Sequence, residues 1–217
     1  MGRHGTAVVV AGGDAPLAHV RELVPDGAYV IAADSGHDHA RALGIVVHRI
    51  VGDLDSADPR AVEIAVAGGA ELEAHPPEKD ATDLELALHA AMEWGVRDVL
   101  VIGGYGGRLD HLLANALVIA APEFASMHVR AYLGAAIVTV VHTEATIMGA
   151  PGDVCSLLAV GSPATDVRTT GLRYPLDGGE LRPGSTLGVS NELVADAATI
   201  TVGSGTVLVI QPEWSQP

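Results

Sequence analysis

Aspartate residues gather where the expected strands of the first half of the chain end. Asp34 follows one apolar run, Asp53 and Asp55 follow the next, and Asp83 opens a later helix. In an open parallel sheet, ligands bind beyond the carboxyl ends of the strands. Asp53 and Asp55 are spaced i, i+2, which places both carboxylates on one side of an extended chain. Two such carboxylates repel each other, so the pair predicts a bound Mg²⁺, which prefers one or two carboxylates with water and substrate phosphate.

A single aspartate after a strand has a simpler interpretation, because Asp is also a common turn and N-cap residue. Several carboxylates expected at one edge of the sheet favour the metal interpretation. Thr82 and Asp83 are also explained as an N-cap and as an acid that complements the helix dipole. The two roles are compatible, since a capped helix would aim Asp83 rigidly at the other carboxylates.

The sequence also offers groups for a phosphate ester. The glycine-rich stretch 103–107 allows backbone N–H groups to approach oxygen closely, and Arg108 directly after it could bind phosphate in a bidentate manner. Neither a P-loop pattern nor a Gly-x-Gly-x-x-Gly fingerprint occurs. Lys79 is the chain's one lysine beside eleven arginines. It could place a point charge on phosphate, or it could be an ordinary surface lysine.

Alternating strand and helix patterns must position these groups. Strands are expected at residues 7–11, 29–33, 49–51, 71–75 and 99–102, and helices at residues 16–23, 36–43, 58–67, 82–94 and 109–121. The helix at 82–94 has the clearest signal, since Thr82 and Glu85 form a capping box and Leu84 and Leu88 begin an apolar face. Strands alternating with helices predict an α/β fold with a doubly wound, mostly parallel sheet.

The pattern changes near residue 127. Short β-rich runs follow at residues 129–133, 137–141, 154–160, 185–189, 199–202 and 206–210, punctuated by Gly, Pro and Asp. They predict a second, smaller all-β domain of sandwich type. We place the boundary near Gly134, which gives an α/β catalytic domain at residues 1–134 and an all-β domain at residues 135–217.

Composition excludes several function classes. The net charge of −15 argues against nucleic acid, whose phosphates require clustered Lys and Arg, and against anionic membranes. No apolar stretch is long enough to cross a membrane, and no signal-peptide pattern is present. The single Cys155 lies in an apolar run and is expected to be a buried structural residue. These features predict a cytoplasmic location.

Four motifs in order resemble those of the thiamine pyrophosphokinase family. They are Ala33-Asp34-Ser35-Gly36, Gly52-Asp53-Leu54-Asp55-Ser56, Lys79-Asp80-Ala81-Thr82-Asp83-Leu84-Glu85 and Gly107-Arg108-Leu109-Asp110-His111 with the following Ala114-Asn115. The second half is similar to the family's thiamine-binding domain through Gly171-Leu172-Arg173-Tyr174-Pro175-Leu176 and Ser190-Asn191. Each motif is weak alone, but the ordered set spans nearly the whole chain.

The resemblance implies an ATP-dependent transferase, a diphosphokinase of thiamine diphosphate biosynthesis that converts ATP and thiamine into AMP and thiamine diphosphate with Mg²⁺. It implies a homodimer with thiamine bound at the subunit interface. Asp53, Asp55 and Asp83 would hold Mg²⁺ and the diphosphate, and Asp110 would lie near the thiamine hydroxyl as the candidate proton acceptor. The implied ATP-phosphate residues are Asp34, Lys79, Thr82 and Arg108, and the implied thiamine residues are Tyr174, Ser190 and Asn191.

One residue departs from the family pattern, since Tyr174 stands where the family usually has Trp. Tyrosine keeps an aromatic face, so a packing role survives while a stacking role is weaker. Two other functions remain open. The same acidic set could serve a diphosphokinase acting on a hydroxymethyl pterin, and a non-catalytic binding or scaffold relative could keep the fold. Ser190 and Asn191 favour thiamine, and the retained carboxylates favour an enzyme.

Overall fold

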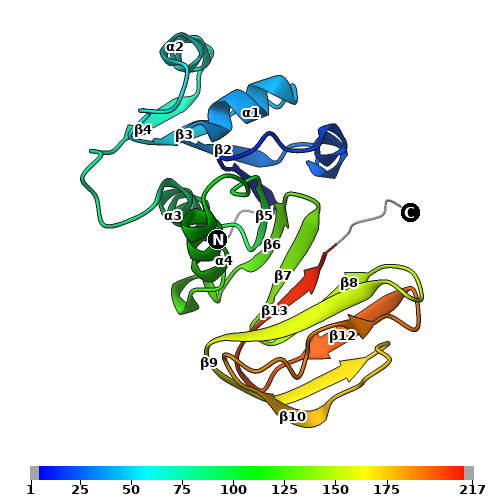
Figure 1. Cartoon of the computed structure of the whole chain (residues 1–217). Helices are drawn as coiled ribbons and strands as arrows, with labels where there is room; N and C mark the ends of the chain where they lie inside the picture. Colours follow the sequence, from blue (N-terminus) through cyan, green and yellow to red (C-terminus); the bar gives the residue numbers. More distant parts are fainter. Residues whose placement is uncertain (1–4, 213–217) are drawn as a thin grey trace. The chain divides into compact units, whose positions relative to one another are not determined.

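The chain folds as a mixed α/β protein, and the computed structural model describes residues 5–212 (Figure 1). It divides into two compact units. The first comprises residues 1–119 and 131–134, and the second comprises residues 120–130 and 135–217. A single cut near residue 134 therefore misses one segment, 120–130, which groups with the second unit. The assignment of a separate function to each unit stays a prediction.

A parallel sheet forms the centre of the first unit. Its strands lie in the order β4-β3-β2-β1-β5, and every neighbouring pair is parallel. After β4 the chain returns to the far side of β1, so the direction of winding reverses between β1 and β5, where such sheets bind ligands. The strands are β1 (Thr6–Val10), β2 (Tyr29–Ala33), β3 (Arg49–Gly52), β4 (Glu71–Ala74) and β5 (Asp98–Ile102). The expected parallel sheet is confirmed.

Helices cover both faces of this sheet. Right-handed crossovers place α1 and α2 on one face and α3 on the opposite face, as Figure 1 shows. Leu84 and Leu88 of α3 are buried, which confirms the apolar face expected there. The helices are α1 (Gly36–Ala42), α2 (Pro59–Ala67), α3 (Asp83–Trp94) and α4 (Leu109–Val118).

Strands make up most of the second unit. They include β7 (Ala136–Val141), β8 (Glu144–Met148), β9 (Val154–Thr170), β10 (Asp177–Leu181), β11 (Asn191–Glu192), β12 (Ala197–Thr201) and β13 (Ser204–Gln211). Antiparallel pairing gives the order β7-β13-β9-β12-β8, with β10 and β11 also paired to β9. The strand β6 (His128–Leu133) and the 3₁₀ turn η2 (Pro122–Phe124) lie within residues 120–134, where the chain passes between the two units.

The long strand β9 explains how a small unit encloses its core. Its first half pairs with β13, which also pairs with Thr165 after a register shift, and its last residues pair with β12 and β10. The register shifts between these halves, where Gly161 takes a φ of 72°. Such a bend lets one strand serve two sheets. Residues such as Leu157, Val167 and Ile200 then pack into a single buried cluster.

Several expected elements differ from the structure. Residues 185–189, expected as a strand, form turns. Pro183 and Gly184 precede them, and the hydroxyl of Ser185 accepts from the Leu187 N–H, which favours a turn. The helix expected at residues 16–23 is the 3₁₀ helix η1 (Ala18–Leu23). Strands β8 and β10 were missed, and Cys155 is buried as expected.

No helix in the described part of the chain is both long and apolar enough to cross a membrane.

Candidate active site

The carboxyl ends of β2 and β3 bring Asp34 close to the start of α3. Asp34 takes a left-handed φ of 48° directly after β2, and its N–H donates to the Val51 carbonyl at 2.9 Å. At the end of β3, Gly52 leaves room for its neighbours. A Cβ at Gly52 would lie 3.0 Å from Asp83 Oδ1 and 3.3 Å from Asp34 Cβ. Glycine is therefore needed here for the two carboxylates to approach.

Asp34, Asp53 and Asp55 form the acidic triad of the site. One carboxylate oxygen from each lies within 4.8 Å of the others. Asp34 Oδ1 is buried and has no hydrogen-bond partner within residues 5–212. Burial raises the pKa of Asp34, the Ser35 N–H opposes this shift, and the neighbouring carboxylates raise it further. An unpartnered buried oxygen facing two more carboxylates is the environment that a divalent cation relieves.

Lys79 holds the acidic triad to α3. Its Nζ lies 2.9 Å from Asp53 Oδ2 and 2.8 Å from Asp83 Oδ1, and its side chain is 12% exposed. Burial lowers the pKa of Lys79, but its bonds to Asp83 and Asp53 outweigh this and raise it, so the ammonium stays charged. The hydrogen bond from Lys79 lowers the pKa of Asp53. The lysine is thus a partly buried cation among the carboxylates.

The start of α3 positions Asp83 for this contact. Thr82 is the N-cap, and its hydroxyl accepts from the Glu85 N–H at 3.2 Å. This bond satisfies a free donor of the first turn and fixes the first helical residue, Asp83. In the structure Asp83 therefore pairs with Lys79, while Asp34 takes the third place beside Asp53 and Asp55.

The loops after β1 and β5 are tied together at the switch point. The Gly104 N–H donates to the Gly12 carbonyl at 2.7 Å, and the Asp14 N–H donates to the Tyr105 carbonyl at 2.7 Å. From α4, Asn115 Nδ2 donates to the Gly104 carbonyl at 2.9 Å. Sequence reasoning gave Asp14 no role and quoted Asn115 only within a motif. The signal for Asp14 was its position directly after Gly12-Gly13 at the end of β1, whereas Asn115 lies within α4 and was marked only by its motif.

Arg108 and Asp110 form an exposed pair at the start of α4. Arg108 Nη2 lies 2.6 Å from Asp110 Oδ2, and both side chains are more than 60% exposed. The hydrogen bond from Arg108 lowers the pKa of Asp110 to about 2. Each charge is therefore satisfied by the other rather than by the acidic triad. The pair is free to rearrange, because solvent surrounds it.

Residues of the second unit form a separate set. Asn191 is buried, its Oδ1 accepts from the Tyr174 N–H at 3.0 Å, and its Nδ2 donates to the Tyr174 carbonyl at 2.8 Å. Both ends of this amide thus hold the backbone of Tyr174, whose side chain is 62% exposed. Ser190 takes a left-handed φ of 58°, and its N–H donates to Ser156 Oγ. Asn191 fixes this loop, while Tyr174 and Ser190 remain available to a ligand.

Two family models match the chain. The model described as "Thiamin pyrophosphokinase, catalytic domain" matches residues 20–131, and the model described as "Thiamin pyrophosphokinase, vitamin B1 binding domain" matches residues 139–207. The first range includes the acidic triad, Lys79 and Arg108. The second includes the loop that Asn191 holds.

Known proteins with these names resemble the chain over nearly its full length. The thiamine pyrophosphokinase of Bacillus subtilis (strain 168) is 28% identical over 227 residues, covering 95% of this chain and 98% of that protein. The crystal structure of thiamine pyrophosphokinase from Bacillus subtilis superposes with a TM-score of 0.83 at 24% identity, covering 97% and 100%. That of thiamin pyrophosphokinase from Geobacillus thermodenitrificans gives 0.80 at 27% identity, covering 97% and 99%.

Proposed function

Because the chain belongs to the thiamin pyrophosphokinase family, we propose that it transfers the diphosphate of ATP to the hydroxyl of thiamine, giving thiamine diphosphate and AMP. The observation that carries this proposal is the acidic triad beside Lys79 at the carboxyl edge of the sheet. It combines carboxylates for a cation with a fixed positive charge for phosphate, which is what transfer of a diphosphate requires.

The residues present fit Mg²⁺. The acidic triad supplies hard oxygen ligands, and the buried Asp34 Oδ1 has no hydrogen-bond partner in the described part of the chain. Asp53 and Asp55 would hold the ion with Asp34. Asp83 would join them where phosphate draws Lys79 away. When bound, Mg²⁺ would neutralise charge on the transferred diphosphate and fix its orientation.

Lys79, Thr82 and Arg108 are the proposed phosphate contacts of this chain. Lys79 already lies between two carboxylates, so its ammonium is held close to where the diphosphate would bind. The exposed Arg108 can swing from Asp110 to phosphate oxygens, for which its planar guanidinium is suited. The glycine-rich loops after β1 and β5 would let backbone N–H groups approach the remaining phosphate oxygens.

The transfer itself is a displacement at the β-phosphorus. The hydroxyl oxygen of thiamine forms a new bond to the β-phosphorus. The bond from the β-phosphorus to the oxygen that bridges it to the α-phosphorus breaks, so that AMP leaves with that oxygen. Asp110 is the proposed acceptor of the hydroxyl proton. While Arg108 holds the pKa of Asp110 at about 2, the carboxylate is a poor base. Movement of Arg108 onto phosphate would release Asp110 and restore its basicity as substrate binds.

Thiamine is proposed to bind beside Tyr174 and Ser190, on the loop that Asn191 holds. We further propose a cytoplasmic homodimer with this site at the subunit interface. The support for a dimer is on α4, where Leu109, Leu113 and Leu117 are spaced i, i+4, i+8 and are each more than 55% exposed. An apolar stripe left open on a helix indicates a partner surface, and a second copy is the proposed partner.

One experiment tests the function. The purified protein is incubated with ATP, Mg²⁺ and either thiamine or a hydroxymethyl pterin, and AMP is measured. AMP formed only with thiamine supports the proposal. AMP formed with the pterin would establish the alternative diphosphokinase, and no AMP with either would leave a binding protein. Gel filtration with light scattering tests the dimer, which Leu113→Glu should dissociate.

A further inference from the structure

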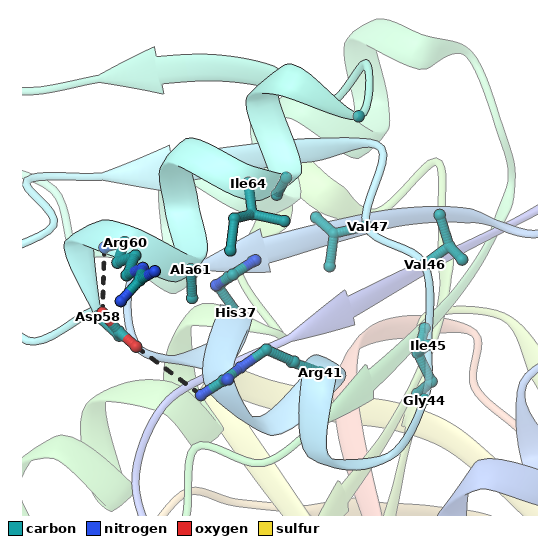
Figure 2. Close-up of a pocket in the computed structure, with 12 residues that line it drawn as sticks. His37, Arg41, Gly44, Ile45, Val46, Val47, Asp58, Arg60, Ala61 and Ile64 are labelled. Carbon is teal, nitrogen blue, oxygen red and sulfur yellow. Dashed lines mark hydrogen bonds and ion pairs between the residues drawn. The ribbon is translucent and has the colours of Figure 1, made fainter.

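A cavity of about 650 Å³ lies between α1 and α2, on one face of the sheet of the first unit (Figure 2). Its size is within the range of about 300–1,000 Å³ that is typical of small-molecule sites. The walls come from α1, from α2 and from the segment 44–47 that follows α1. None of the residues assigned above to ATP, Mg²⁺ or thiamine lines it.

Most of the cavity wall is apolar. Ala61, Ile64 and Ala65 of α2 line one side, and Val46 and Val47 approach from the segment after α1. Ile64 is 67% exposed and Val46 is 76% exposed, although both are large aliphatic residues. Figure 2 shows Ile64 and Val47 directed into the space between the helices. A flat apolar ring would cover these side chains.

One polar group lies deep in the cavity. The side chain of His37 is 5% exposed, and its Nδ1 has no hydrogen-bond partner among the described residues. The nearest carboxylate oxygen, Asp38 Oδ1, is 3.9 Å away, which is too long for a hydrogen bond. Burial lowers the pKa of His37 despite the opposing effect of Asp38, so the imidazole is neutral at neutral pH. A buried ring nitrogen without a partner is unusual and invites a ligand atom.

Charges stand only at the rim. Arg41, Arg60 and Asp58 line the cavity, which gives a net formal charge of +1 when His37 is neutral. Arg41 Nη2 lies 3.9 Å from Asp58 Oδ2 and 3.6 Å from Asp38 Oδ1, so its guanidinium is loosely held and 62% exposed. This rim suits an anionic group and disfavours a cationic ring such as a thiazolium.

The cavity wall packs on the same residues as the loop 53–55, which carries two carboxylates of the acidic triad. Val47 and Ala65 pack on a buried cluster of Ile50, Ala57 and Val62, and Leu54 packs on the same cluster. Leu54 separates Asp53 from Asp55 and takes a left-handed φ of 64°. The apolar cluster that holds this strained loop therefore also supports the cavity wall. A ligand in the cavity would therefore contact Val47 and Ala65, which pack on the same apolar cluster as the loop between Asp53 and Asp55.

We propose that the cavity between α1 and α2 receives the base of a purine nucleotide, with the ring edge bonded to His37 Nδ1 and the α-phosphate, the one next to the ribose, toward Arg41 and Arg60. A purine has flat apolar faces, and its edge carries both donors and acceptors, so it bonds either tautomer of a neutral imidazole. That the nucleotide is substrate ATP rests on the proposed function. A separately bound nucleotide is the other source of the same chemistry.

The test measures binding of adenosine to the whole chain by calorimetry, in the wild type and in two matched variants of α2. Ile64→Glu places a carboxylate at the cavity, whereas Val66→Glu makes the same change at an exposed aliphatic residue of that helix outside the cavity. Ile64→Glu should weaken adenosine binding about tenfold or more, and Val66→Glu should leave it unchanged. Binding of tripolyphosphate with Mg²⁺ should be the same in all three proteins.

A third variant, His37→Phe, keeps an aromatic ring and removes both ring nitrogens. It should weaken adenosine binding about fivefold, with folding checked by circular dichroism. Unchanged adenosine binding in folded Ile64→Glu and His37→Phe would overturn the proposal. The cavity would then be a gap in the packing of α1 and α2 rather than a binding site. The KM for ATP separates the two sources, since it rises with adenosine Kd only where the base is that of the substrate. Adenosine binding requires no turnover, so a protein that forms no AMP would refute the proposed function while leaving this result intact.

Discussion

The acidic triad with Lys79 and the Arg108–Asp110 pair are both short-range charge arrangements, but their surroundings differ. Lys79 is 12% exposed and contacts two carboxylates, whereas Arg108 and Asp110 are each more than 60% exposed and contact one another. Partial burial fixes the first arrangement, because an unpaired charge there is costly. The second is surrounded by water, which screens it and lets either partner leave.

This difference indicates two roles in one reaction. In the proposed reaction, the acidic triad would be the preformed site for the cation, with Lys79 drawn toward phosphate as it binds. In the proposed reaction, the Arg108–Asp110 pair would keep each group from acting until substrate separates the two. Preorganisation and adaptability are thus divided between the edge of β3 and the start of α4.

The largest effect is expected at the acidic triad. Asp53→Asn or Asp55→Asn should lower Mg²⁺-dependent turnover about 10³-fold, because each removes a carboxylate charge from the proposed ion. Steady-state AMP release across a Mg²⁺ titration measures this loss. Asp26→Asn, at an exposed turn of the same unit, is the matched control and should retain full activity. Near-normal rates in the Asp53 variant at ordinary Mg²⁺ would count against the metal assignment.

A smaller effect is expected at the exposed pair. Asp110→Asn should lower kcat about 10²-fold, because it removes the proposed acceptor of the hydroxyl proton. Single-turnover AMP formation measures the chemical step. Arg108→Gln should remove the bond that lowers the Asp110 pKa, so the acidic limb of the rate profile should move to higher pH. Unchanged turnover in Asp110→Asn would exclude it as the proton acceptor.

Much of the acidic site was predictable from the sequence, and the part that was not predictable has a physical cause. Apolar runs ending in Gly and Asp located the strands and placed Asp34, Asp53 and Asp55 at one edge, because parallel strands share a carboxyl edge. The partnership of Lys79 with Asp53 was not predictable. It depends on how far α3 lies from β3, which packing of Leu84 and Leu88 sets and local pattern does not.

The second unit was harder to predict for a related reason. Strand β9 continues past residue 160 through Gly161 and Pro163, residues that ordinarily end a strand. Pairing with β13, β12 and β10 stabilises it across that bend. Likewise, Ser185–Val189 has strand-like composition, but a local hydroxyl bond makes it a turn. Long-range pairing and short side-chain bonds both override local propensity.

A stability measurement compares the two charge arrangements directly. Lys79→Met should lower the free energy of unfolding by about 1–3 kcal/mol in EDTA, because Asp53 and Asp83 lose their shared donor while partly buried. Added Mg²⁺ should restore part of this loss by binding the freed carboxylates. Arg108→Met, the matched change at the exposed pair, should have no measurable effect in urea unfolding. Equal losses in the two variants would show that burial does not distinguish them.

The smallest effect is expected from protonation of Asp34. Burial and neighbouring carboxylates raise its folded pKa above the unfolded value, so the folded state binds more protons. Without metal, this contribution to stability is therefore greatest below the unfolded pKa and is lost as pH rises through the folded pKa. Asp34→Asn removes the charge at nearly constant shape and should stabilise the metal-free protein near pH 7 by about 1 kcal/mol or less. It should also flatten that part of the pH dependence of urea unfolding. Asp26→Asn should leave the dependence as it is, and an unchanged dependence in Asp34→Asn would mean that Lys79 alone already relieves the repulsion within the acidic triad.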